Sequence, residues 1–435
     1  MIEAWRQRFN RGFSQDAFLR VLRAVEDEVG GPIPFRLAES PIFLPGALVD
    51  EMRLATEAIL AEIFAHPEYA DRVRRHVPPQ AFLPTSSDHP PFVQCDFALA
   101  EGDGGRVVPR LIEIQGFPSL YAFQHALSRA YQEAFALTSE VSFFGRGIDE
   151  SGFLALFRQA VLGGHDPETV ALVDVHPWEQ GTWPDFRLTQ RLLPGLAVVG
   201  ATEVLRRGDR LFYRERGREV KIARIFNRLV WEDVRRVESE MAFRLGEPLD
   251  VEWAGEPGWF FQLSKLVLPL VSHPSVPRSY FLDEHPVSAA DLHRYVLKPL
   301  FSFAGKGLVL DLDEEGLAAI PAAERASWVL QEKVQYADVV KTPDGSRVRC
   351  EVRLMFLWLD RPVHVLVLPR FSRGRLMGCA FNTADPWTGH GVAFIESGGA
   401  APHPRASEAA SLAGAREGSP ASDTLPLKPP LAPPK

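Results

Sequence analysis

The stretch YVLKPLFSFAGKGLVLDL, residues 295–312, decides the fold. A short apolar run ends at Lys298, a loop of small residues carries Gly305, Lys306 and Gly307, and a second apolar run follows. This order predicts a strand, a glycine loop and a second strand at 308–312. Glycines let backbone N–H groups approach an anion, and Lys298 and Lys306 add positive charge, so phosphate is the expected ligand.

Two familiar phosphate-binding loops are excluded. A P-loop requires a first glycine where Leu300 stands and a Ser or Thr where Gly307 stands. The dinucleotide fingerprint requires a third glycine where Leu310 stands. From this stretch alone, a glycine-containing hairpin with lysines on its solvent face remains an equal alternative.

Composition limits the class of protein. The 435 residues allow two or three domains, and 46% hydrophobic with 24% charged residues is ordinary for a soluble enzyme. A net charge of -8 argues against a nucleic-acid binder that depends on bulk electrostatics. Cys95, Cys350 and Cys379 are too far apart to indicate a disulfide framework or a zinc site.

The sequence indicates neither export nor a membrane. Its start, MIEAWRQRFNRGF, lacks the apolar segment of a signal peptide, and no later run approaches the roughly 20 apolar residues of a membrane span. A globular cytoplasmic protein is therefore expected, with its oligomeric state open.

Residues 1–90 are expected to form a helical cap. Apolar side chains recur there at helical spacing in two segments: Phe18, Val21, Leu22 and Val25, then Leu54, Ile59, Ile63 and Phe64. No chemistry is visible in this region, and His76 and His89 are expected to be surface or packing residues.

Residues 92–116 predict a hairpin with a polar face. Strands at 92–99 and 107–114 flank a turn rich in Gly and Asp. Asp96 lies on the first strand, and Glu113 and Gln115 point to one face of the second because side chains alternate along a strand. Two carboxylates and an amide oxygen would suit Mg²⁺. A half-buried hairpin whose polar face meets solvent remains the alternative.

Residues 117–290 predict a change of architecture. Helices are expected over 121–131, 151–162 and 185–193, and strands at 169–175, 196–199 and 222–226. Strands that alternate with helices predict a parallel sheet that binds ligands at its carboxyl ends. Residues 236–290 are expected to be helix and loop. Lys265 in this region is either a surface lysine with an apolar stem, which is favoured, or a phosphate contact.

Beyond the glycine loop, three strands are predicted at 327–334, 348–356 and 363–368. Alternation puts Glu351, Arg353 and Met355 on one face of the second strand. The following run contains Arg370, Arg373 and Arg375, then Asn382, Gly389, His390 and Gly391. Arginines so close together in an acidic protein indicate a bound anion, with a solvated turn as the alternative.

The last segment has a different composition. From about residue 397 the chain is rich in Ala, Pro, Ser and Gly, and it ends in PLKPPLAPPK. Such a segment cannot bury enough surface to offset its ordering entropy, so disorder is expected.

Taken in order, YVLKP, FSFAGKG, VLQEKV, EVRLMF and PRFSRG with FNTADPWTGHG resemble the successive elements of the ATP-grasp fold. Because Asp96 and Glu113-x-Gln115 precede Lys298, the order resembles the circularly permuted branch typified by glutathionylspermidine synthase, and LIEIQGFPSL is similar to a segment of that branch. The resemblance covers residues 92–394. One departure is Gln115, where that branch has Asn.

The resemblance implies a mixed α+β and α/β architecture: two ATP-grasp subdomains that sandwich ATP, a small α/β domain and the N-terminal cap. The corresponding ranges are 1–90 for the cap, 91–165 for the metal-binding part, 166–290 for the substrate-side domain, 291–396 for the nucleotide-binding part and 397–435 for the tail.

The resemblance also implies a reaction: ATP-dependent ligation of a carboxylate to an amine through an acylphosphate, with release of ADP and phosphate. Asp96, Glu113 and Gln115 would hold Mg²⁺, and Arg353 or Arg370 would steady the transferred phosphoryl group or the tetrahedral oxyanion. The implied ATP-binding residues are Lys298, Ser302, Gly305, Lys306, Gly307, Gln331, Glu332, Lys333, Val334 and, at the ribose, Asp338.

Two other functions remain open. A nucleotide-binding protein without ligase activity is supported by Gln115, and a small-molecule kinase on the same fold would release a phosphorylated product. The carboxylate and amine substrates are not identified by the sequence; no nucleic acid or membrane is expected as a partner.

Overall fold

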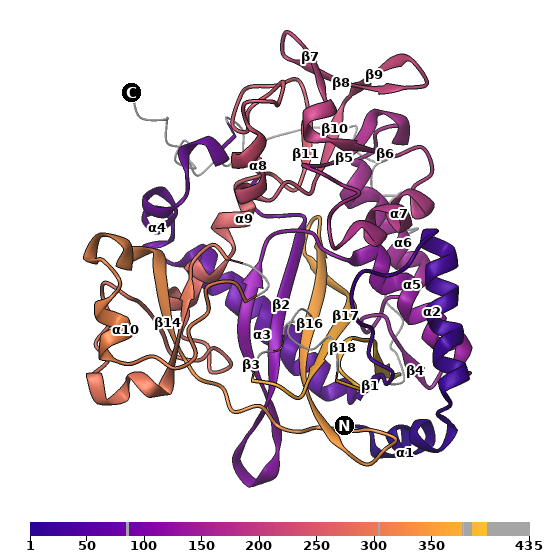
Figure 1. Ribbon diagram of the computed structural model, residues 1–435, viewed down its shortest axis with the longest axis vertical. Helices are drawn as coiled ribbons and strands as arrows, with labels where there is room; N and C mark the ends of the chain where they lie inside the picture. Colours follow the sequence, from indigo (N-terminus) through magenta and orange to yellow (C-terminus); the bar gives the residue numbers. More distant parts are fainter. Residues whose placement is uncertain (84–86, 303–304, 376, 378–384, 398–435) are drawn as a thin grey trace, which may run out of the picture. The chain divides into compact units, whose positions relative to one another are not determined.

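The largest sheet joins two segments that lie far apart in the sequence (Figure 1). The computed structural model describes residues 1–83, 87–302, 305–375, 377 and 385–397. The strands of this antiparallel sheet follow the spatial order β18 (Gly389–His390), β17 (Pro362–Ser372), β16 (Arg347–Trp358), β2 (Phe92–Glu101) and β3 (Val107–Gln115), and β15 (Val340–Lys341) also pairs with β16. The predicted hairpin at 92–116 is confirmed, and its first strand pairs with β16.

The two faces of this sheet have different partners. Val352, Leu354 and Phe356 of β16 pack into one apolar cluster, together with residues of α3 (Gly46–Ala65). Met355 and Leu357 belong to a second cluster on the other side. The alternation predicted for this strand is therefore confirmed, and it puts Glu351 and Arg353 on the same face as Met355.

A second sheet of four strands is wholly parallel. Its spatial order is β11 (Glu252–Ala254), β10 (Arg224–Asn227), β5 (Val170–Asp174) and β6 (Ala197–Gly200). It is accompanied by α6 (Glu150–Leu162), α7 (Trp183–Leu192), α8 (Trp231–Val237) and a small sheet of β7 (Leu205–Arg207), β8 (Arg210–Glu215) and β9 (Arg218–Ile222). The predicted parallel sheet is confirmed; β11 lies in a region where no strand was predicted.

The stretch that opens the sequence analysis forms only part of the predicted strand–loop–strand. β13 (Tyr295–Pro299) pairs with β14 (Trp328–Glu332), which also pairs with β12 (Ser279–Phe281). The second predicted strand, at 308–312, is wrong: among the described residues its only pairing with β13 is the bridge between Leu297 and Val309. Residues 308–312 do not extend into a full strand, because the next residue, Asp313, is already the N-cap of α10 (Glu314–Ala318).

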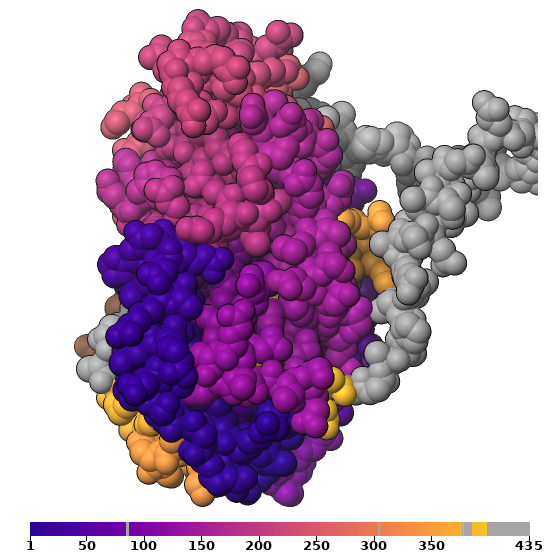
Figure 2. All heavy atoms as spheres, turned by 90° about the vertical axis from the view of Figure 1, so that its right-hand side faces the viewer, coloured from indigo at the N-terminus to yellow at the C-terminus, as the bar shows by residue number. Residues whose placement is uncertain are grey.

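The N-terminal helices are confirmed, but they share both cores rather than covering them from outside. The elements are α1 (Glu3–Gly12), α2 (Gln15–Val29), β1 (Ile42–Leu44), α3 and α4 (Tyr69–His76). Figure 2 shows the indigo N-terminal residues against magenta ones, in agreement with the packing of α2 on α5 (Tyr121–Ala134). β1 pairs in parallel with β19 (Ala393–Glu396), whose other neighbour is β4 (Val141–Ser142).

Side-chain burial in these helices follows the predicted periodicity with one exception. Phe18, Val21 and Val25 are buried in α2, which begins at the capping residue Ser14. Leu54, expected in the apolar stripe of α3, is 55% exposed and is therefore a wrong assignment.

Short elements complete the description: α9 (Trp259–Gln262) and the 3-10 turns η1 (Pro79–Ala81), η2 (Asp103–Gly105), η3 (Pro167–Thr169), η4 (Ala201–Glu203), η5 (Lys265–Leu270), η6 (Ala289–Arg294) and η7 (Ala322–Ser327). Residues 1–398 form one unit, so the boundaries predicted after 90, 165 and 290 fall inside it and stay predictions. Within the described ranges, no helix combines the length and apolar character that a membrane crossing requires. The tail predicted from 397 lies outside the described residues from 398 onward.

Candidate functional site

Asp96 is the centre of a buried ion-pair network. The pairing of β2 with β16 sets Asp96 opposite Arg353, whose Nε and Nη2 donate to the two carboxylate oxygens at 2.6 and 2.7 Å. Arg370 of β17 donates to the same carboxylate at 2.6 Å. Burial alone would raise the pKa of Asp96, but the two guanidinium groups outweigh it and hold that pKa well below its usual range.

The network continues on the opposite side of Arg370. Arg370 also pairs with Glu351, and the hydroxyl of Tyr336 donates to the other oxygen of Glu351 at 2.9 Å. Burial raises the pKa of the Tyr336 phenol well above its usual value, so it remains a donor. Two arginines therefore face two carboxylates, and the group is electrically balanced.

Two amides surround Arg353. The oxygen of Gln94 accepts from Arg353 at 3.0 Å. The Gln115 amide lies beside both groups: its nitrogen donates to the Gln94 oxygen at 2.5 Å, and with the amide turned over its oxygen would lie 3.1 and 3.2 Å from the two terminal nitrogens of Arg353. Gln115 therefore belongs to the hydrogen-bond network around Arg353, and its role as a metal ligand stays a prediction.

Two buried lysines lie next to this network. Lys298 of β13 donates to Gln331 at 2.5 Å and to the carbonyl of Ile112 at 3.2 Å. Burial lowers the pKa of Lys298 to about 8. Lys265 donates to Glu113 at 2.5 Å and also to the carbonyl of Ser302.

Lys265 is not the surface lysine that the apolar run favoured: it is buried, and its ammonium pairs with Glu113. Because Lys265 also lines the cavity described below, the alternative of a phosphate contact stays a prediction. The sequence does contain a signal for this burial. Lys265 stands in an apolar run that packs on two sides, and a lysine buried in this way requires a carboxylate partner.

One cavity of about 730 Å³ brings the predicted nucleotide-binding residues together. Its described lining contains nine Lys and Arg but only four Asp and Glu side chains, in a chain of net charge -8. The predicted residues in this lining are Glu113, Gln115, Lys298, Ser302, Gly305, Lys306, Gln331, Glu332, Lys333, Val334, Arg353 and Arg370. Four further carboxylates just outside the lining, those of Asp96, Asp185, Asp311 and Asp338, pair with arginines of this wall, which makes eight carboxylates against the nine cations.

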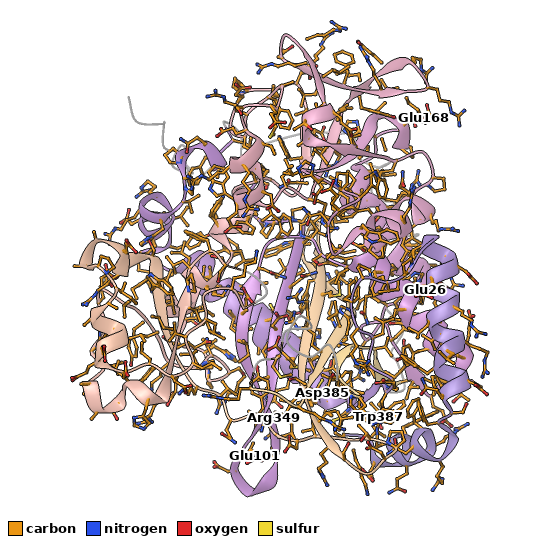
Figure 3. All side chains as sticks on the ribbon, in the orientation of Figure 1. Glu26, Glu101, Glu168, Arg349, Asp385 and Trp387 are labelled. Atoms are coloured by element: carbon orange, nitrogen blue, oxygen red, sulfur yellow. The ribbon has the colours of Figure 1, made fainter. Side chains whose placement is uncertain are left out.

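Three predicted site residues do not line this cavity. Asp96 is buried behind the arginines, and Gly307 has a φ of +73°, with Pro299 where a side chain would stand. The exposed carboxylate of Asp338 pairs with Arg349 at 3.3 Å, near the end of the central sheet where Figure 3 labels Arg349. Asp338 itself does not line the cavity, although its partner Arg349 does, so the ribose role of Asp338 stays a prediction.

The predicted arginine cluster divides into separate contacts. Arg370 belongs to the ion-pair network, Arg375 lines the cavity and pairs with Asp311 at 2.6 Å, and Arg373 lies 3.8 Å from Asp344. His390 lines the cavity, and burial lowers its pKa to about 3, so its imidazole is neutral. Asn382 lies outside the described residues.

The opposite end of the cavity was found only in the structure. Asp174, the last residue of β5, and Arg228, which follows β10, both line it at the carboxyl ends of the parallel sheet. Burial raises the pKa of Asp174 to about 6 although Arg228 opposes this rise. The sequence predicted a ligand at these strand ends but did not single out either residue.

Arg228 is held in place by Asp185. Its Nη1 donates to Asp185 at 2.7 Å, and its guanidinium lies 4.7 Å from the ring centroid of Phe186. Asp185 also accepts from the backbone N–H groups of Leu120 and Phe123, each at 3.0 Å.

Two buried polar atoms in the cavity wall lack a hydrogen-bond partner among the described residues: Nε of Arg228 and the amide nitrogen of Gln331. One lies toward each end of the cavity. Buried donors of this kind are normally satisfied, so both ends favour a polar ligand.

The three predicted magnesium ligands do not form a cation site as they stand. Asp96 is engaged by two arginines and Glu113 by Lys265. Within the described ranges, no three His, Cys, Asp or Glu side chains lie together as a metal site would require.

Comparisons with known proteins provide evidence on the fold only. No protein-family model matches this sequence, and no curated protein matches it. Among solved structures, the chain is similar to a glutathione synthetase-like effector from Globodera pallida, solved in its apo form, with a TM-score of 0.52 and 14% identity over 88% of this chain and 98% of that one. The chain therefore has a mixed α+β fold related to that of a glutathione synthetase-like protein.

Proposed function

We propose that this protein is an ATP-dependent carboxylate–amine ligase with a circularly permuted ATP-grasp arrangement. The supporting observation is that four lysines and, from the carboxyl ends of the parallel sheet, Asp174 and Arg228 line one cavity of about 730 Å³. In the proposed reaction, a substrate carboxylate oxygen attacks the γ-phosphorus of ATP and ADP leaves. An amine then attacks the acyl carbon of the acylphosphate, which releases phosphate.

The lysine-rich end takes the triphosphate. Lys298 and Lys333 contact the α- and β-phosphates, and Lys306 with the loop N–H groups covers the β/γ region. Fixed ammonium groups in a site partly closed to water stabilise the charge that develops as the phosphoryl group moves. The main chain at 331–334 reads the adenine edge.

The resemblance also implies Mg²⁺, which neutralises phosphate charge in phosphoryl transfer. Because Asp96 and Glu113 are already engaged by cations, no step of this proposal depends on a metal held by them.

The end of the cavity that carries Asp174 and Arg228 binds the amine substrate. A buried carboxylate at Asp174 pairs with a substrate ammonium, and the Nε of Arg228 donates to a substrate carboxylate. A substrate that carries both groups, such as an amino acid or short peptide, fits this pair.

Glu113→Ala is expected to abolish ATP turnover, because it leaves Lys265 buried without its carboxylate next to the phosphate end. ADP release in the presence of carboxylate and amine panels is the measurement. Glu101→Ala, which removes an exposed carboxylate of the same sheet outside the cavity, is the matched control. Unchanged turnover in the Glu113 variant would contradict the role of Glu113.

Asp174→Asn is expected to stabilise the fold while weakening the acceptor site. A carboxyl group whose folded pKa is raised from 3.8 to about 6 costs stability once ionised, and this cost disappears as the pH falls through 6 toward 4. The variant should therefore be more stable by ~2–3 kcal/mol at pH 7.5 and equal to wild type near pH 4. Chemical denaturation at both pH values measures this, with the exposed Asp209→Asn as control. Equal stability at pH 7.5 would contradict an ionised, buried Asp174.

A second candidate is a nucleotide-binding protein without ligase activity. The observation that favours it is the engagement of Asp96 by Arg353 and Arg370. ATP binding without ADP release across both substrate panels would support this candidate, whereas ADP release that requires carboxylate and amine together would support the ligase.

A further inference from the structure

The chain neutralises its own carboxylates at the phosphate end of the cavity. Asp96 and Glu351 face Arg353 and Arg370, and Glu113 faces Lys265. Each of these three carboxylates accepts from a cation of the protein at 2.7 Å or less. A divalent cation would have to displace these partners, which are shielded from solvent and therefore strongly held.

The ion pairs come from different strands, which makes them rigid. Asp96 lies on β2, Arg353 and Glu351 on β16, and Arg370 on β17, and backbone pairing sets Glu351 opposite Arg370 as well as Asp96 opposite Arg353. To free Asp96, both arginines would have to turn away within a paired sheet. Each would then leave a buried charge unpaired, at a cost of several kcal/mol.

The lysines retain donors for a ligand. An ammonium has three N–H groups. Lys298 uses two of them, on Gln331 and Ile112, and Lys265 uses two, on Glu113 and Ser302. Both lysines line the cavity, and among the described residues each has one N–H group that makes no hydrogen bond and is open to an anion there.

We propose that this protein binds a nucleoside triphosphate without a divalent cation held by its side chains, because Arg353 occupies the position at which Asp96 and Gln115 were expected to hold the metal. The phosphates are neutralised by the fixed lysines of the cavity. This inference concerns the same site as the proposed function and rests on its nucleotide assignment.

The test uses the full chain and two probes. Mn²⁺ alone is titrated against the protein by electron paramagnetic resonance, and ATP is titrated by calorimetry in EDTA and in excess Mg²⁺. We expect no Mn²⁺ bound at millimolar concentration, and an ATP affinity in EDTA within tenfold of that with Mg²⁺.

Three results would overturn the inference. One is a bound Mn²⁺ ion that Asp96→Asn removes and Glu101→Gln, at the exposed end of the same strand, leaves in place. Another is an ATP affinity at least tenfold lower in EDTA, and the third is no ATP binding in either buffer. The last two need only the wild type, so a misfolded variant does not decide the outcome.

A double variant tests the role of Arg353 directly. Arg353→Gln with Asp96→Asn removes both charges of a pair together and avoids an unpaired buried ion. It should bind ATP in EDTA with an affinity within tenfold of wild type, because the lysines and not Arg353 neutralise the phosphates, with its fold checked by circular dichroism. A loss of more than tenfold in the folded double variant would contradict the assignment of the phosphates to the lysines.

Failure of the proposed function is distinguishable from failure of this inference. ATP that binds in EDTA but is never converted to ADP contradicts the ligase and leaves the inference intact. ATP that binds and turns over only through a protein-held metal contradicts the inference and leaves the ligase intact.

Discussion

Asp96→Ala is expected to lower the free energy of unfolding by ~3–5 kcal/mol, because it leaves Arg353 and Arg370 in the sheet without their shared carboxylate. Asp96 is only 2% exposed, so water cannot take the place of that carboxylate. Chemical denaturation followed by tryptophan fluorescence measures the loss.

The matched control is Glu101→Ala, at the exposed end of the same strand, where Figure 3 labels the residue. Its effect should stay within about 0.5 kcal/mol. A loss below 1 kcal/mol in the Asp96 variant would contradict the ion-pair network.

The same network predicts a loss of stability in acid. The folded pKa of Asp96 lies below its unfolded value, so its contribution is complete above the unfolded pKa of about 4 and is lost as the pH falls toward the folded one. The difference between wild type and Asp96→Asn should therefore shrink steadily below pH 4.

Lys298→Met is expected to weaken ATP binding roughly 10- to 100-fold, the effect of removing one charge-assisted hydrogen bond from a buried site. Methionine retains most of the stem of Lys298, which is 7% exposed, and removes only the ammonium. Calorimetry with ATP measures the affinity, and Lys341→Met, an exposed lysine outside the cavity, is the control.

The pH dependence of ATP binding gives an independent readout. Because burial lowers the pKa of Lys298 to about 8, its charge is lost at a lower pH than that of an ordinary lysine. Wild-type affinity should fall between pH 7 and 9, and the Lys298→Met variant should lack this fall. An ATP affinity equal to that of wild type in the variant would remove Lys298 from the nucleotide site.

Local sequence pattern predicted the strands and helices that have a strong period. The hairpin at 92–116 and the alternation along β16 follow from the two-residue period of a strand, which each segment carries by itself. The order of strands and helices from 169 to 226 likewise predicted a parallel sheet.

Patterns that depend on a neighbour were less reliable. The run at 308–312 has the composition of a strand, but it makes a single bridge because the helix cap at Asp313 follows at once. Lys265 has the pattern of a surface lysine, but packing on both sides of its 3-10 turn buried it.

Sequence alone determined which residue types stand at the candidate site: lysines near a glycine loop, carboxylates on a hairpin and arginines on the strands that follow. Tertiary structure decided which of them meet. Strand pairing between β2 and β16 set Asp96 opposite Arg353, and no property of either segment by itself contains that register. Asp96 has the chemistry of a metal ligand, but in the folded protein Arg353 and Arg370 neutralise it, because a buried charge is stable only when it is paired with an opposite charge.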